Sequence, residues 1–151
     1  MRINLLVSQG RAADKTVRII EGAALTGRTL QDRFGVTAHF LGEPSPPAED
    51  DWTESLPQAR PTLDAVAGAL DASLAGGGLT VLASNTCSIS LSSLPVVAWH
   101  FPDTLLLWID PHGDFNTPLS TGSGYLGGMG WWRQCAGSGI AVTVRAWIRR
   151  M

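Results

Sequence analysis

The residues best suited to chemistry form one short D-x-H-x-D motif at residues 110–114. In an extended backbone alternate side chains point the same way, so Asp110, His112 and Asp114 can project together. Two carboxylates and one imidazole make a mixed oxygen and nitrogen ligand set, which suits Mn, Zn or Fe better than a soft metal. Because the motif is short, an ordinary polar loop with solvated acids is the alternative. The motif therefore identifies a candidate metal site.

The motif directly follows the most apolar run of the chain, residues 105–109 (LLLWI). A run that is apolar at every position predicts a strand covered on both faces of a parallel sheet. In open α/β sheets, ligands bind in the crevice beyond the carboxyl ends of the strands. We therefore predict a central, buried strand over residues 105–109, which would deliver the three side chains of the motif to one cleft. Cys87 is predicted close by, at the end of the neighbouring strand.

The elements before this run predict an α/β fold. Shorter apolar runs predict strands over residues 3–7, 36–41 and 79–83. Apolar residues at helical spacing predict helices over residues 17–34, 63–74 and 87–100. Alternating strands and helices are typical of a parallel sheet with helices on both faces.

Glycine and proline mark where these helices are expected to be interrupted. Gly22 and Gly27 favour two pieces in the first helix, for which Asp14 is a candidate cap. Pro95 is expected to kink or divide the third helix. Residues 43–57 contain four prolines and several acids. They are predicted to form an exposed loop, because proline disfavours both helix and sheet.

The composition is that of a soluble globular domain. The 151 residues are 44% hydrophobic and 16% charged, with a formal net charge of -2. This profile excludes a disordered chain, and it offers no general attraction for nucleic acid or anionic membranes. Two cysteines are too few for a disulfide framework. No apolar stretch approaches the roughly 20 residues of a spanning helix. We therefore expect a cytoplasmic protein.

The motif and its flanks resemble the arginase, agmatinase and formiminoglutamase (ureohydrolase) family, whose signature is D-x-H-x-D after an apolar strand. The similarity continues through N-T-P at residues 116–118 and S-G-Y-L-G-G-M at residues 123–129. It implies a three-layer α/β/α fold with a parallel sheet. It also implies hydrolysis of a guanidino or formimino C–N bond of a small molecule at two manganese ions, and a full-length form that assembles into homo-oligomers.

The resemblance implies roles for individual residues. Asp110 and Asp114 would bind or bridge the two Mn²⁺ ions, and His112 would be a terminal ligand. Asp114 would also be the catalytic residue that orients the attacking water and receives its proton. Asn116 and Ser123 would contact the amino-acid end of the substrate.

The sequence departs from the family pattern at two positions of the predicted site. Cys87 stands where the family has the histidine ligand of a G-G-D-H-S motif. A thiolate can bind a metal but favours softer ions than manganese. A small buried cysteine at a helix start, with no role in metal binding, is the alternative. Gly127 stands where arginases have a histidine associated with proton transfer, which leaves other guanidine or amide substrates open.

The family's second Asp-x-Asp pair and its late glutamate have no counterpart among the 151 residues. We therefore expect an incomplete metal site in an inactive chain, with a family-like part at residues 1–129 and an atypical tail at residues 130–151. An out-of-frame reading of a GC-rich gene would explain the tail. Such a chain is predicted to pack poorly over its tail, to leave apolar surface exposed and to aggregate.

Two other functions fit parts of the sequence. Metallophosphoesterases also use D-x-H, but near the start of their domain and followed by G-D-x-x-D and G-N-H-[ED] motifs that this sequence lacks. A non-catalytic fragment or pseudoenzyme would keep the first half of the fold and act by binding. The number of metal ions bound per chain distinguishes these alternatives.

Overall fold

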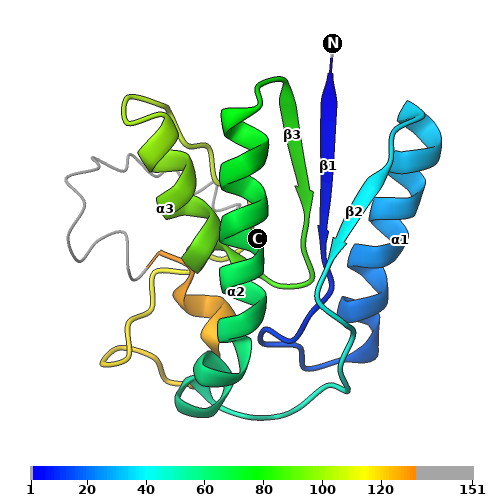
Figure 1. Ribbon diagram of the computed structural model, residues 1–151. Coiled ribbons are helices and arrows are strands. Elements are labelled where there is room, and N and C mark those ends of the chain that lie inside the picture. The colour runs from blue at the N-terminus through cyan, green and yellow to red at the C-terminus, as the bar shows by residue number, and fades with distance from the viewer. Residues whose placement is uncertain (1, 132–151) are drawn as a thin grey trace.

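A parallel sheet forms the centre of the computed structural model, which describes residues 2–131 (Figure 1). Its strands are β1 (Ile3–Ser8), β2 (Ala38–Leu41) and β3 (Leu79–Ala83), in the spatial order β2-β1-β3. Both neighbours run parallel to β1, and Leu6 pairs with His39 on one side and Leu82 on the other. The three strands predicted before residue 100 are therefore confirmed.

Helices and short 3₁₀ turns connect the strands. The helices are α1 (Val17–Phe34), α2 (Trp52–Ala75) and α3 (Ser90–His100), and the turns are η1 (Cys87–Ile89) and η2 (Leu126–Met129). Helix α1 ends at Gly35, whose φ of 63° is the left-handed conformation that glycine adopts readily. Helix α2 begins after Asp51, whose carboxylate accepts a hydrogen bond from the Thr53 N–H at 2.7 Å.

Two hydrophobic clusters cover opposite faces of the sheet. Leu5 and Val7 of β1 belong to one cluster, on the face covered by α1. Leu63 and Val66 of α2 belong to the other, together with apolar residues of η1, α3 and η2. Leu82, which lies beside Leu6 in the sheet, packs against this second cluster. The predicted α/β/α arrangement with a parallel sheet is therefore confirmed.

Helix α1 corrects two predictions. The helix runs unbroken through Gly22 and Gly27, so the prediction of two pieces is wrong. A Cβ at Gly27 would lie 2.4 Å from a methyl carbon of Val7, so the missing side chain lets the helix approach β1 closely. Asp14 is not the cap, because Thr16 precedes the helix. The Asp14 carboxylate is buried and accepts hydrogen bonds from within the protein instead.

Proline is tolerated in the other two helices. Pro57 and Pro61 lie inside α2, so the predicted loop at residues 43–57 is wrong from Trp52 onward. Buried residues of α2 pack into the core along its length, and this packing offsets the single backbone hydrogen bond that each proline removes. Helix α3 likewise continues through Pro95 to its end, so the proline does not divide it.

The predicted fourth strand is wrong. Residues 105–109 form no strand within the described part of the chain, and the side chains of Leu105, Leu107 and Ile109 are 83%, 72% and 86% exposed. An apolar run indicates that its side chains favour burial, but a β-strand also needs a neighbouring strand with which its backbone can form hydrogen bonds. No element of residues 2–131 pairs with this run. The expected exposure of apolar surface is therefore observed here.

The start of the predicted tail is well packed. Gly130 is buried and Trp131 is 1% exposed, so the prediction of poor packing is wrong for these two residues. The rest of the predicted tail, residues 132–151, lies outside the described residues. Within the described part of the chain, no helix combines the length and apolar character needed to cross a membrane.

Candidate metal centre

Three potential metal ligands from separate parts of the chain meet beside the carboxyl end of β3. Single ligand atoms of Cys87, Asp110 and Asp114 all lie within 4.8 Å of one another. Cys87 begins η1, directly after the loop that leaves β3, and its thiol donates to Asp110 Oδ2 at 3.8 Å. Asp110 and Asp114 lie in the irregular segment that follows residues 105–109. The predicted cysteine and both predicted aspartates are thus close together.

Aromatic packing holds Asp114 in a strained backbone conformation. Its φ of 50° lies in the left-handed region that residues other than glycine rarely adopt. The Trp131 N–H donates to the Asp114 carbonyl at 3.2 Å, and the Trp131 ring stacks on Phe115 at a centroid distance of 5.7 Å. Trp108 packs edge-on against Trp131 at 5.2 Å. Because Trp131 anchors the chain on both sides of the motif, the strained conformation is held in place.

Two sets of hydrogen bonds position Cys87. The Ser90 hydroxyl lies 2.6 Å from the Cys87 carbonyl and 3.1 Å from the Gly130 carbonyl, which ties η1 to the chain after η2. Upstream, the Asn85 amide donates to Asp14 Oδ1 at 2.6 Å and to the Gly10 carbonyl at 3.0 Å. The loop that carries the cysteine is therefore fixed to the loop that follows β1.

Burial and neighbouring negative charges favour the protonated forms of Cys87 and Asp114. Burial raises the pKa of the Cys87 thiol to about 12, and the charges of Asp114 and Asp110 contribute. Burial also raises the pKa of Asp114, with a further contribution from the charge of Asp110, while the neighbouring thiol of Cys87 opposes the shift. A positive charge among these groups would reverse both effects.

Known proteins are similar to this chain over most of its length. No family model matches the chain. The chain is 54% identical over 144 residues to the N(omega)-hydroxy-L-arginine amidinohydrolase of Streptomyces lavendulae, an alignment that covers 91% of this chain and 53% of that protein. Mitochondrial arginase-2 of Rattus norvegicus is 27% identical over 126 residues, covering 82% of this chain and 34% of that protein. Over the aligned residues, the chain belongs to the arginase family.

Solved arginase structures share the fold of this arginase-family chain. The arginase of Bacillus caldovelox superposes with a TM-score of 0.60 at 21% identity, over 85% of this chain and 46% of that one. The arginase of Bacillus cereus superposes with a TM-score of 0.61 at 23% identity, over 85% and 45%. The chain thus spans about half the length of the amidinohydrolase and of both arginase structures. The high identity favours the ureohydrolase interpretation over the metallophosphoesterase one.

The cluster of this arginase-family chain has the chemistry of a cation site. Asp114 Oδ2 is buried and has no hydrogen-bond partner within residues 2–131, and an unpaired buried carboxylate oxygen is costly. A cation beside it would supply the missing partner. One sulfur and two carboxylate oxygens are ligand types that proteins use for transition metals. The residues present therefore fit a divalent ion.

His112 is not part of this cluster. Its side chain is 79% exposed, and Nδ1 lies 3.2 Å from Asp110 Oδ1. The His112 N–H also donates to the same oxygen at 2.7 Å, so the backbone turns at Asp110 and does not stay extended. Alternation of side chains holds only in extended backbone. The predicted role of His112 as a ligand thus stays a prediction that the geometry does not favour.

The two predicted substrate residues lie on the loop after the cluster. The Asn116 N–H donates to the Gly128 carbonyl at 3.0 Å, and the Ser123 hydroxyl accepts from the Tyr125 N–H at 3.3 Å. Both residues are exposed and lie outside the group of three potential ligands. Their contacts with a substrate stay predictions.

A cavity of about 390 Å³ opens next to the cluster. Cys87 and Asp110 form part of its wall, and the rest comes from β3 and the loop after it, from η1 and α3, and from residues 107–109. Because residues 107–109 do not pair with β3, a gap separates the two segments. The cavity gives a small molecule access to two of the three potential ligands.

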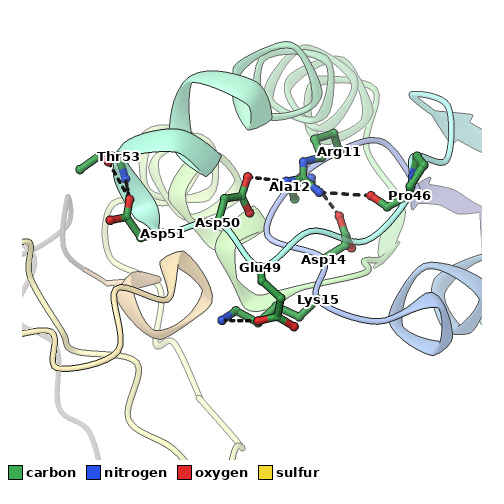
Figure 2. Close-up of polar contacts among 9 residues, drawn as sticks. All are labelled: Arg11, Ala12, Asp14, Lys15, Pro46, Glu49, Asp50, Asp51 and Thr53. Atoms are coloured by element: carbon green, nitrogen blue, oxygen red, sulfur yellow. Dashed lines mark hydrogen bonds and ion pairs between the residues drawn. The ribbon is translucent and has the colours of Figure 1, made fainter.

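Sequence reasoning missed two residues near the centre. Asp14 was interpreted as a helix cap, although its carboxylate accepts hydrogen bonds from the Ala12 N–H (Figure 2) and from Asn85, a residue of the loop that carries Cys87. Tyr125 received no role, although burial raises the pKa of its phenol to about 12, with a contribution from the charge of Asp114. The available signal for Tyr125 was its place in the S-G-Y-L-G-G-M segment, beside a glycine at the position where arginases have a histidine.

Proposed function

We propose that this chain carries part of a metal-dependent amidinohydrolase site that hydrolyses a guanidino C–N bond in a small molecule related to N(omega)-hydroxy-L-arginine. The observation that supports this proposal is the cluster of Cys87, Asp110 and Asp114, in which a buried carboxylate oxygen has no partner. The chain is 54% identical to an N(omega)-hydroxy-L-arginine amidinohydrolase, which supports the substrate class.

Asp114 is the residue best placed to handle a proton. A bound divalent ion would polarise the substrate and lower the pKa of an attacking water. One carboxylate oxygen of Asp114 would bind the ion, and the other would orient that water and accept its proton. Burial raises the pKa of Asp114, which makes the carboxylate a better proton acceptor. Asp110 and Cys87 would hold the ion beside it.

The identity and number of the ions follow from the ligands. The family resemblance implies two manganese ions, whereas a thiolate among three ligands favours a softer ion such as zinc. The cluster offers one ligand atom from each of three residues. We therefore propose that the chain binds one divalent ion, and that it binds zinc more tightly than manganese.

Metal binding tests this proposal. Equilibrium dialysis against Zn²⁺ or Mn²⁺, followed by elemental analysis, is expected to give about one ion per chain. Asp114→Ala should remove this ion, whereas Asp64→Ala, a change on the exposed face of α2, should not. A chain that binds no ion, or an Asp114→Ala variant that binds as well as the original, would contradict the proposal.

Catalytic turnover is a separate question. We propose that the 151-residue chain alone hydrolyses neither arginine nor agmatine measurably, because three ligands cannot hold the two-metal centre that the family resemblance implies. Urea release that Asp114→Ala abolishes would show that this part of the proposal is wrong. The tail boundary at residue 129, a cytoplasmic location and assembly into homo-oligomers stay predictions.

A further inference from the structure

Asn85 lies two residues before Cys87, and its side chain is buried. The amide nitrogen donates to Asp14 Oδ1 at 2.6 Å and to the Gly10 carbonyl at 3.0 Å. The amide oxygen accepts from the Ser8 hydroxyl at 3.4 Å. All three partners lie at the carboxyl end of β1 or in the loop after it. One side chain therefore bonds the loop after β3 to the loop after β1.

Asp14 is a fixed anchor for this amide. Its carboxylate is buried, and Oδ2 accepts from the Ala12 N–H at 3.0 Å while Oδ1 accepts from Asn85 (Figure 2 shows the Ala12 contact). The Asp14 carbonyl accepts from the Ala48 N–H at 2.9 Å. Because each carboxylate oxygen has a donor and the backbone is bonded as well, this buried network is satisfied and holds one arrangement.

The position of the Cys87 thiol depends on the loop that Asn85 anchors. Residues 84–86 connect β3 to η1, and Cys87 is the first residue of η1. The sulfur lies within 4.8 Å of a carboxylate oxygen of Asp110 and of Asp114, which belong to a different segment of the chain. A shift of residues 84–86 would therefore move the sulfur away from the two carboxylates and leave the carboxylates in place.

We propose that Asn85 and Asp14 act together as positioning residues that hold the Cys87 thiolate in the ligand set, and that they thereby set the preference of the site for zinc over manganese. This inference rests on the proposed metal site. The thiolate is the soft ligand of the three, whereas two carboxylates alone suit harder ions such as manganese. Neither residue belongs to the group of potential ligands, so both act through the backbone that carries Cys87. Partners that orient metal ligands typically contribute about 10–100-fold to metal affinity.

Exchange of the two side chains tests the pair. Asn85→Asp removes the amide donor and places two carboxylates face to face, so Zn²⁺ should bind about 10–100-fold more weakly and Mn²⁺ affinity should change less. Asp14→Asn, at a residue 71 positions from Asn85 in the chain, turns one acceptor into a donor and should weaken Zn²⁺ binding in the same direction. The double variant again places a donor opposite an acceptor, so it should regain about tenfold over Asn85→Asp, the order of one hydrogen bond to a charged group.

Co²⁺ reports on the thiolate directly. A thiolate bound to Co²⁺ gives a sulfur-to-cobalt charge-transfer band in the near ultraviolet, and its intensity per bound ion measures the thiolate's share in binding. The band should be present in the original chain, weaker in Asn85→Asp and partly recovered in the double variant. Asn4→Asp is the matched control, because the Asn4 amide donates to the Gly77 carbonyl at 3.0 Å near the opposite end of the sheet. This variant should keep the band even where it lowers stability.

Circular dichroism identifies which variants are folded. A folded Asn85→Asp chain with the zinc affinity and the cobalt band of the original would overturn the inference and leave the proposed function standing. A band that weakens equally in Asn4→Asp would overturn it as well, because the effect would then follow stability and not the position of the thiolate. If Asn85→Asp does not fold, Asp14→Asn decides by the same two measurements. An original chain that binds neither Zn²⁺ nor Co²⁺ would overturn both the inference and the proposed function.

Discussion

The pH dependence of metal binding tests whether Cys87 is a ligand. A thiol binds metal as thiolate, and burial with two neighbouring aspartates raises the pKa of this thiol to about 12. At pH 8 only about one chain in ten thousand would hold the thiolate before metal binds. Binding must therefore release the thiol proton. The apparent association constant for Zn²⁺ should rise about tenfold per pH unit between pH 7 and 9.

Substitutions at residue 87 test whether the proton released on metal binding comes from the Cys87 thiol. Cys87→Ser removes the thiol, so the tenfold slope should disappear. Cys87→His introduces an imidazole that is already neutral above about pH 7, so zinc should still bind without the slope. Cys135→Ser removes the other cysteine of the sequence and should leave the slope unchanged.

A competitive titration with a chromophoric chelator measures the affinity at each pH. Proton release into a weakly buffered solution gives an independent count, which should be about one proton per zinc ion at pH 8. An original chain whose affinity does not change between pH 7 and 9, or a Cys87→Ser variant with the same slope, would refute the assignment of Cys87 as a ligand.

Three further predictions concern the fold around the centre. In α1, Gly27→Ala should destabilise the protein by about 1–3 kcal/mol, because the added methyl group overpacks against β1. Gly22→Ala should instead stabilise it by roughly 0.5–1 kcal/mol, because a Cβ at this position meets no atom within 4 Å. Urea unfolding measures both changes in free energy. Asp14→Ala should cost about 1–3 kcal/mol, because it leaves a buried backbone N–H without its acceptor, and a loss no larger than that of the exposed Asp64→Ala would contradict the network. Absorbance at 295 nm should show that Tyr125 stays protonated up to about pH 11. Because its pKa is higher in the folded state than in the unfolded state, its contribution to stability should be lost as pH rises from about 10 to about 12. A folded-state pKa near 10 would contradict its burial.

The amino-acid sequence by itself determined the elements that depend on residues close together in the chain. The strand at residues 79–83 was predicted at its observed limits, because an apolar run lies between a glycine cluster and a polar loop. The predicted ends of the first two helices, residues 34 and 74, lie within one residue of the observed ends at Phe34 and Ala75. The D-x-H-x-D motif identified two of the three clustered ligands and the family. Each of these conclusions depends on residues close together in the chain.

The tertiary structure decided what depends on distant partners. Residues 105–109 are as apolar as a buried strand, yet they form none, because pairing requires a second backbone that the described residues do not provide. His112 has the spacing of a ligand but faces solvent, because the chain turns at Asp110. Asp14 precedes a helix but accepts its hydrogen bond from Asn85, 71 residues away. Local sequence determines conformational preference, whereas pairing, burial and side-chain direction are decided by the groups that the fold brings together.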